Sequence, residues 1–262
     1  MKELCTMTNL GIGLVAALAI TLHSPAQTST TGLQPTATEE KEIQQQSMAP
    51  GHAEQKYDFQ RNIAPYFAPA TDAPKRPDAD GFVQRWLLLE PIVKANRTNA
   101  IFTGTYVRKT FHEEYFPGQF TVLPHDGDAV TVEGRQLFWH AFDAKDFNIK
   151  LFRFAYGLNK PTYGVIFWMT TVIESPQEIA DVRMAVGSNS ASMWWLNGEE
   201  AADLFDDRRM VMDDVVSKPL TLKKGRNVVR GAIINGPGLS DFCLRFIDEN
   251  GKPVRNFSIP AL

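Results

Sequence analysis

The 262-residue sequence has little cysteine, no long hydrophobic run and no large excess of one charge. It contains 2 cysteines, Cys5 and Cys243. Because Cys5 falls in a segment that we expect to be cleaved, no intrachain disulfide is expected in the mature chain. The 27 basic and 30 acidic residues give a net charge of -3, which implies no polyanionic partner and argues against nucleic-acid binding. Stability therefore has to come from the burial of a hydrophobic core.

The longest apolar run lies near the N-terminus, between Leu10 and Leu22. Lys2 precedes this run and Ser24-Pro25-Ala26 follows it, which is the pattern of a cleaved signal peptide over residues 1–26. The run is about 13 residues long, shorter than the roughly 20 that a membrane-spanning helix needs. The sequence therefore predicts no membrane span and a protein that is periplasmic or secreted.

Three segments follow the predicted signal peptide. Residues 27–56 are rich in Thr, Gln, Pro, Ser and Glu and carry few large apolar side chains, so we predict a disordered linker. Residues 57–80 mix aromatic residues with four prolines, which indicates an extended segment on the surface of the domain rather than regular structure. Residues 81–262 form the predicted folded domain, which is long enough to enclose one core.

Alternating apolar and polar side chains dominate residues 81–262. In DVRMAVG, for example, Val182, Met184 and Val186 share one face, as in a half-buried antiparallel strand. The same pattern predicts strands in six more stretches: GFVQRWLLLEPI, DAVTVEGRQLFWHAFD, NIKLFRFA, GVIFWMTTVIES, RNVVRGAIIN and DFCLRFID. Turn pairs such as Asn197-Gly198 separate the strands. The expected fold is all-β, a two-sheet antiparallel β-sandwich of the jelly-roll, galactose-binding-like type.

One stretch has helical rather than strand spacing. TYVRKTFHEEYF places Val107, Phe111 and Tyr115 four residues apart, which predicts one short helix with a single apolar stripe. Parallel strands need a crossover helix between each pair, so a single helix argues against a Rossmann or α/β-hydrolase sheet. GSNSAS also lacks the second glycine of a nucleophile elbow.

The remaining polar residues indicate no catalytic centre, and no catalytic residue is predicted. His112 lacks the second histidine that would complete a zinc-binding helix face, His125 lies in a Gly/Asp loop, and His140 alternates with neighbours in a strand. We therefore predict no metal and no cofactor. A calcium ion at the acidic pairs Asp206-Asp207 and Asp213-Asp214 is an alternative, because carboxylate oxygens suit calcium.

Two adjacent tryptophans, Trp194 and Trp195, stand out in GSNSASMWWLNG. On a strand they face opposite sides of the sheet, so one can lie in the core and the other needs a cover or a ligand. The alternation does not decide which is which. Indole rings lie well against the C–H faces of sugars, and Asn, Asp and Arg side chains match sugar hydroxyls. The candidate carbohydrate-binding residues combine these side-chain types: Trp194, Trp168, Trp139, Asn189, Arg209, Asp213 and Asp214.

Three motifs occur in order: VRMAVGSNSASMWWLNGEEA, LTLKKGRNVVRGAIINGPG and DFCLRFIDENGKPV. Together, over roughly Glu174 to Val254, they resemble the galactose-binding-like β-sandwich modules attached to bacterial polysaccharide-degrading enzymes. From Gly81 onward the chain is similar to the non-catalytic module that accompanies acetyl xylan esterases of gut Bacteroidetes. Two positions depart from the family pattern: its Asp-Asp-Gly turn is replaced by residues 188–191 (SNSA), and the aromatic of its Gly-aromatic-Asn turn by Arg226.

The resemblance implies an exported, non-catalytic carbohydrate-binding-type module associated with the degradation of plant polysaccharide, specifically xylan. The implied partners are a polysaccharide or oligosaccharide and a catalytic esterase or glycoside hydrolase. Two alternatives remain open: an acetyl xylan esterase or other carbohydrate-active hydrolase, and a structural or assembly β-sandwich that binds no sugar.

Overall fold

The computed structural model describes residues 61–94, 104–205, 209–234 and 240–262. The predicted signal peptide (residues 1–26) and linker (27–56) lie outside these ranges. No helix within the described ranges has the length and apolar character needed to cross a membrane.

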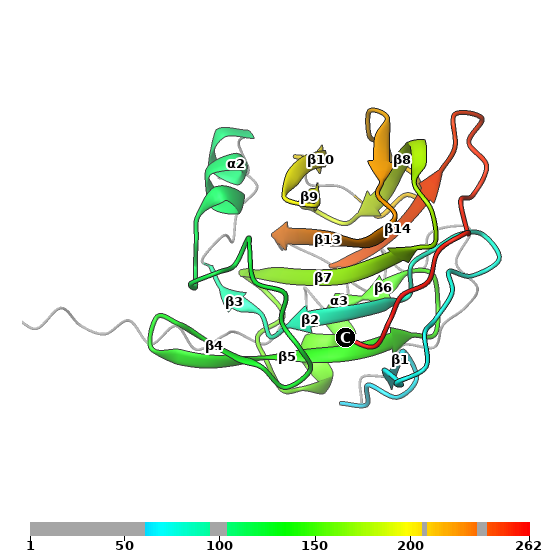
Figure 1. Cartoon of the computed structure of the whole chain (residues 1–262). Helices are drawn as coiled ribbons and strands as arrows, with labels where there is room; N and C mark the ends of the chain where they lie inside the picture. The colour runs from blue at the N-terminus through cyan, green and yellow to red at the C-terminus, as the bar shows by residue number, and fades with distance from the viewer. Residues whose placement is uncertain (1–60, 95–103, 206–208, 235–239) are drawn as a thin grey trace, which may run out of the picture.

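The larger of two sheets has nine strands, and all of its pairings are antiparallel (Figure 1). Its main path runs in the order β1 (Phe67–Pro69), β5 (Arg135–Ala144), β2 (Arg85–Leu89), β7 (Val165–Ser175), β13 (Gly225–Ile234), β9 (Ala191–Leu196), β10 (Glu199–Leu204). Two short strands join at the side: β3 (Ile92–Val93) pairs with β7, and β4 (Ala129–Val132) pairs with β5.

The smaller sheet has five strands and is also antiparallel. Its order is β11 (Val215–Val216), β8 (Ile179–Ser188), β14 (Asp241–Ile247), β6 (Ile149–Lys150), and β12 (Leu220–Leu222) pairs with β8. These two sheets confirm the predicted all-β, two-sheet antiparallel sandwich.

The main hydrophobic core lies between the two sheets. At its centre Trp86 of β2, Trp194 of β9 and Phe242 of β14 are buried with ring centroids 5.1 to 6.0 Å apart. Aromatic side chains bury large areas, and edge-to-face pairs add to the stability that burial supplies. Because the three rings come from both sheets, they join the layers of the sandwich.

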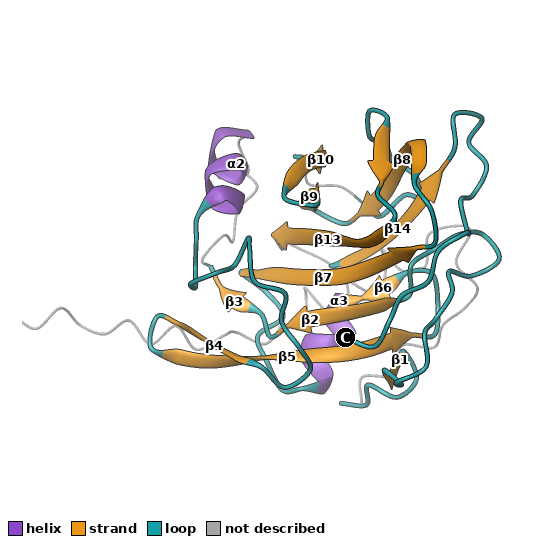
Figure 2. Ribbon diagram, in the orientation of Figure 1, coloured by secondary structure: helices purple, strands orange, loops and turns teal. Residues whose placement is uncertain are grey.

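The outer face of the larger sheet is also covered over its central strands, so strands such as β2 and β7 are buried on both sides. Helix α2 (Gly104–His112) and the loop over residues 113–128 cover it and form a second apolar cluster with strands β2, β5, β7 and β9 (Figure 2). Strand β7 accordingly reads as a nearly continuous run of buried residues, of which only Glu174 is exposed. A strand covered on both faces has this composition, because neither face can be polar.

The predicted helix is present, and a second helix replaces a predicted strand. Helix α2 buries Val107 and Phe111, as the spacing predicts, but ends at His112, before Tyr115. The strand prediction for NIKLFRFA is wrong beyond Lys150, because α3 (Leu151–Gly157) begins there. Leu151, Phe154 and Leu158 stand at helical spacing and pack into the main core, which a strand could not arrange.

The proline-rich segment contributes to the larger sheet. Residues 61–80 mostly lack regular structure, but Phe67–Pro69 pair with Ala144 to Phe142 as the edge strand β1. Lys75 forms a bridge with Ile259 near the C-terminus. The expectation of a segment without regular structure therefore fails for these edge residues, where Pro69 is tolerated because an edge strand has one unpaired side.

Candidate functional site

The two adjacent tryptophans face opposite sides of the larger sheet, and both are buried. Trp194 points into the main core at 0% exposure, and its Nε1 donates to Ser192 Oγ at 3.0 Å. Trp195 points to the outer face, where it stacks on Trp168 at 5.6 Å between centroids and packs against Phe120 at 5.8 Å. Trp194 therefore offers no ring face to a ligand, and the cover of Trp195 is the loop after α2.

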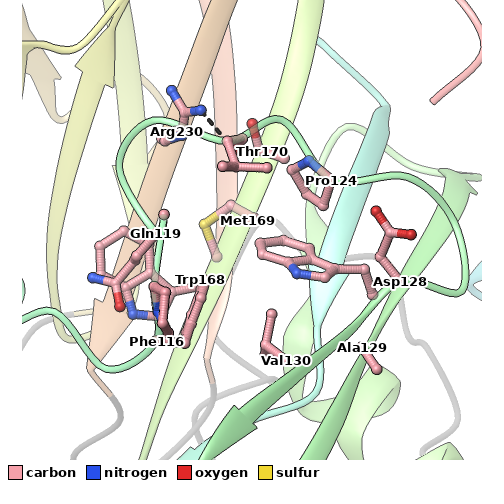
Figure 3. Close-up of a pocket in the computed structure, with 14 residues that line it drawn as sticks. Phe116, Gln119, Pro124, Asp128, Ala129, Val130, Trp168, Met169, Thr170 and Arg230 are labelled. Carbon is pink, nitrogen blue, oxygen red and sulfur yellow. Dashed lines mark hydrogen bonds between the residues drawn. The ribbon is translucent and has the colours of Figure 1, made fainter.

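A cavity of about 230 Å³ lies between this loop and the outer face of the larger sheet (Figure 3). It is lined by aromatic, small and polar residues from the loop, β4, β5, β7 and β13: Phe116, Pro117, Gly118, Gln119, Val122, Pro124, Asp128, Ala129, Val130, Trp139, Trp168, Met169, Thr170 and Arg230. Two of the seven candidate binding residues, Trp139 and Trp168, are among them.

The aromatic wall of the cavity is formed by Trp139 of β5 and Trp168 of β7. Phe116 meets Trp139 edge-on at 6.3 Å, and Phe120 meets Trp168 edge-on at 5.5 Å, so the loop holds both indoles in place. The Trp168 side chain is 2% exposed, and its Nε1 has no hydrogen-bond partner among the described residues. A buried indole N–H normally donates to an acceptor, so the unpaired Nε1 of Trp168 is an exception to this rule.

Arg230 supplies the positive charge of the cavity. It lies on β13 directly across from Thr170 of β7 and is 7% exposed. Its Nη2 donates to the carbonyl oxygen of Val122 at 3.0 Å, drawn as a dashed line in Figure 3. Burial lowers the pKa of the Arg230 guanidinium, and no carboxylate of the described residues lies within 4 Å of it to offset that burial.

Asp128 supplies the negative charge, and its loop is tied to β5. The Trp139 amide donates to the Asp128 carbonyl oxygen at 2.9 Å, and the Ala141 amide donates to Asp126 Oδ1 at 2.7 Å. The Asp128 carboxylate accepts from the His125 amide at 2.8 Å through Oδ2, and its side chain is 52% exposed. The carboxylate is therefore held in position while remaining open to solvent.

The covering loop is also braced on its other side. A turn at Gly118, whose φ of +78° favours glycine, brings the Val122 amide to the Gly118 carbonyl oxygen at 2.8 Å. Gln119 accepts from the Tyr115 amide at 2.8 Å and donates to the Glu113 carbonyl oxygen at 3.0 Å. Because these bonds are internal to the loop, the cavity has a preformed wall.

The four predicted polar residues lie outside the cavity lining. Asn189 exchanges hydrogen bonds with the backbone of Asp241 at the start of β14, at 2.9 and 3.2 Å. Both carboxylate oxygens of Asp213 accept from the Arg245 guanidinium. Arg209 is exposed, and Asp214 is half-buried beside Asp213. Within the described residues, no group of three or more His, Cys, Asp or Glu side chains is arranged to hold a metal ion.

The three described histidines each contact a carboxylate. His112 lies 2.5 Å from Glu200, His125 lies 3.5 Å from Asp128, and His140 lies 3.4 Å from Glu90.

Cys243 is fully buried, and burial raises the pKa of its thiol to about 12. A thiol in that state is a poor nucleophile.

Sequence reasoning missed the two charged residues of the cavity. For Arg230 a signal exists: in RNVVRGAIIN it shares a face with Ala232 and Ile234, both buried in the outer cluster. A charge in phase with buried apolar residues indicates a cavity or a partner, because an isolated buried charge is unfavourable. Asp128 carries no such signal, since its position depends on how the loop packs on β5.

Comparisons with known proteins establish no family for the chain. No protein-family model and no curated protein matches it. Similar solved structures include a PA14 sugar-binding domain from an RTX adhesin, with 12% identity over 69% of this chain and 100% of that chain and a TM-score of 0.35. The epithelial adhesin 9 A domain from Candida glabrata in complex with Galb1-3GlcNAc shows 9% identity over 74% of this chain and 96% of that chain, with a TM-score of 0.33. A Kluyveromyces marxianus β-glucosidase shows 20% identity over 62% of this chain but only 14% of that chain, with a TM-score of 0.30. At these TM-scores, the similarity assigns no ligand to this chain.

Proposed function

We propose that this protein is a non-catalytic carbohydrate-binding module and that the cavity on the outer face of its larger sheet is the sugar site. The observation that carries the proposal is the convergence of two indoles, Trp139 and Trp168, with Asp128 and Arg230 around one preformed cavity. Ligand sites combine an apolar wall with a few placed polar groups in this way. Indoles suit the C–H face of a sugar ring, while the carboxylate and the guanidinium suit its hydroxyls.

The size of the cavity supports a small part of a glycan as the ligand. Its volume of about 230 Å³ is below the roughly 300 to 1,000 Å³ of sites that enclose drug-sized ligands. A single sugar residue, either a chain end or a side branch, is therefore the unit that we propose to be bound.

The finer parts of the proposal come from the sequence. The segment Lys2 to Ala26 has the pattern of an export signal, so we propose a periplasmic or secreted protein. The resemblance to modules that accompany acetyl xylan esterases supports xylan as the polysaccharide and a catalytic esterase or glycoside hydrolase as the partner. These assignments depend on the resemblance and not on the cavity.

Affinity electrophoresis through gels that contain xylan tests the sugar site. Asp128→Asn keeps an oxygen that can accept from the His125 amide but removes the charge, and we expect it to weaken retention by about 10-fold, since hydrogen bonds to charged groups are strong. Trp139→Ala should abolish retention by removing the aromatic wall. The matched control is Phe138→Ala, because Phe138 is the adjacent residue of β5 and is 38% exposed.

Thermal unfolding of each variant separates loss of binding from loss of folding, because truncating a buried tryptophan costs about 3–5 kcal/mol. If folded Asp128→Asn and Trp139→Ala both bind as the wild type does, the cavity is not the sugar site.

Incubation of the purified protein with an aryl acetate distinguishes the binding module from the alternative, a hydrolase. Turnover above the buffer rate that is lost on mutation of a single serine would replace our proposal with an esterase.

A further inference from the structure

We propose that the sugar bound in this cavity is acidic, and that its carboxylate is held by Arg230. This inference rests on the proposed carbohydrate-binding function and specifies its ligand class. It narrows the ligand from sugars in general to residues of the hexuronate type.

Arg230 carries a buried charge that the described residues leave without a counter-charge. The guanidinium carries five N–H donors, and the described residues engage it through one hydrogen bond, from Nη2 to the Val122 carbonyl oxygen at 3.0 Å. The other well-buried arginine that lies on a strand of the same sheet, Arg85, is paired with Asp143 at 2.8 Å. Buried charges in folded proteins are normally paired, because an unpaired one loses its hydration without compensation. Arg230 instead faces a cavity, where an anionic ligand group can complete the pair.

The donors that remain on Arg230 indicate which ligand group would suit it. Among the described residues, only one of its five N–H groups has an acceptor. A carboxylate is acceptor-only and has about four lone-pair sites, so it can accept from two N–H groups of one guanidinium at once.

The negative charge of the cavity is on Asp128. Asp128 belongs to the loop before β4, whereas Arg230 belongs to β13, so the two charges approach the cavity from different walls (Figure 3). The exposed Asp128 carboxylate would repel an anion and accept from hydroxyls. The polar groups of the cavity therefore match a ligand with a carboxylate at one side and hydroxyl groups at the other, which is the chemistry of a uronic acid.

Arg230 also anchors the loop through Val122, and this structural role has to be separated from ligand binding. A loop anchor needs only one of the five N–H groups of the guanidinium. Arg230→Gln retains an amide donor for the Val122 carbonyl oxygen but removes the charge. Arg230→Lys retains the charge but loses the planar fork that matches a carboxylate. Arg226→Gln is the matched control, because Arg226 is exposed and lies four residues earlier on the same face of β13.

Isothermal titration calorimetry with paired ligands tests the inference: glucuronate against glucose, galacturonate against galactose, and unsubstituted xylo-oligosaccharides as neutral chains. Each uronate differs from its partner only in the group at C6. We expect the wild-type protein to bind each uronate at least about 10-fold more tightly than the neutral sugar, as a charge-assisted bidentate contact predicts. Arg230→Gln should remove this preference, Arg230→Lys should retain part of it, and Arg226→Gln should leave it unchanged.

Three results would overturn the inference. Equal affinity for uronates and neutral sugars leaves the carbohydrate site in place but removes the acidic specificity. Undiminished uronate preference in folded Arg230→Gln shows that the carboxylate lies elsewhere. If neither the uronates, the neutral sugars nor the xylo-oligosaccharides bind, the proposed function fails together with the inference. A thermal unfolding measurement on each variant establishes that it is folded, and Arg230→Lys serves as the test if Arg230→Gln is not.

Discussion

At the scale of single residues, the packing of the Trp194 indole in the core depends on the glycine opposite it. Gly231 of β13 lies directly opposite Trp194 on β9 and opposite Met169 on β7. A Cβ atom at position 231 would lie 2.5 Å from Trp194 Cε3 and 2.8 Å from Met169 Sδ, closer than atoms in contact approach. The missing side chain leaves the space that the Trp194 indole fills, so Trp194 is a core residue because its cross-strand neighbour is glycine.

Gly231→Ala is therefore expected to destabilise the protein by about 1–3 kcal/mol, the usual cost of overpacking a core. Urea unfolding followed by tryptophan fluorescence measures the change. Gly104→Ala is the control, since a Cβ there meets nothing within 4 Å and its φ is not in the left-handed region. Sugar binding by Gly231→Ala should persist, because Gly231 itself does not line the cavity. Wild-type stability in Gly231→Ala would contradict this account of the core.

At the scale of elements, helix α2 is attached to the larger sheet by two kinds of contact. Its apolar stripe is buried, while its exposed side pairs with β10: Arg108 Nη1 reaches Glu200 at 3.2 Å, and Nη2 reaches Asp203 at 3.0 Å. His112 donates from Nδ1 to the Arg108 carbonyl oxygen at 2.7 Å and contacts Glu200 through Nε2. Both ring nitrogens of the protonated imidazole are donors, so the charged form satisfies both acceptors.

These contacts raise the pKa of His112, first through the backbone hydrogen bond to Arg108 and then through Glu200, and they lower the pKa of Glu200. The His112 contribution is thus fully present below its unfolded-state pKa and is lost as the pH rises through the raised pKa. The Glu200 contribution is present above its unfolded-state pKa and is lost as the pH falls through the lowered value. The attachment of α2 should be firmest between the two folded-state pKa values.

Hydrogen exchange checks this expectation through the protection factors of the α2 amides at about pH 5.5 and about pH 8.5, on either side of the ordinary histidine pKa. Protection should be lower at the higher pH in the wild type. The difference should disappear in His112→Gln and persist in His125→Gln, whose side chain is 77% exposed in the wild type. The same pH effect in all three proteins would show that His112 is not its source.

At the scale of the whole molecule, Arg85 joins segments that are far apart in the sequence. Its guanidinium pairs with Asp143 of β5 at 2.8 and 3.0 Å and donates to the Ala73 carbonyl oxygen at 2.7 Å. It also donates to the Pro260 carbonyl oxygen at 3.3 Å, next to the C-terminus. The side chain is 1% exposed, so one buried cation connects β2 and β5 to the segment that precedes β2 and to the C-terminal segment.

Arg85→Met should lower the free energy of unfolding by about 3–5 kcal/mol, because it leaves Asp143 without its buried partner. Lys75→Met is the control: Lys75 lies 3.8 Å from the same carboxylate but is 26% exposed, so its loss should cost less than about 1 kcal/mol. Urea denaturation monitored by circular dichroism distinguishes the two. Equal losses in both variants would show that the network around Arg85 is not a principal support of the fold.

The amino-acid sequence alone determined the local structure of most of the domain. Alternation placed β5, β7, β8, β13 and β14, because a period of two depends only on which face of a strand is buried. The alternation pattern gave the wrong element at α3. Leu151 and Phe152 are adjacent apolar residues there, which breaks the alternation, and Leu151, Phe154 and Leu158 have the spacing of a helix. The sequence also predicted the turn between β9 and β10, because an Asn-Gly pair favours a tight hairpin turn. Asn197 and Gly198 both adopt positive φ there.

Only the tertiary structure decided where the cavity lies and which residues surround it. Trp139, Trp168 and Arg230 stand on three strands that antiparallel pairing brings together, while Asp128 comes from a loop that packs on β5. The sequence proposed both of these tryptophans as binding residues but grouped them with Trp194, which the core encloses. Which face of a strand is buried can be predicted from the alternation of apolar and polar side chains along that strand. A cavity depends on pairings between residues about a hundred positions apart, and no local pattern records those pairings.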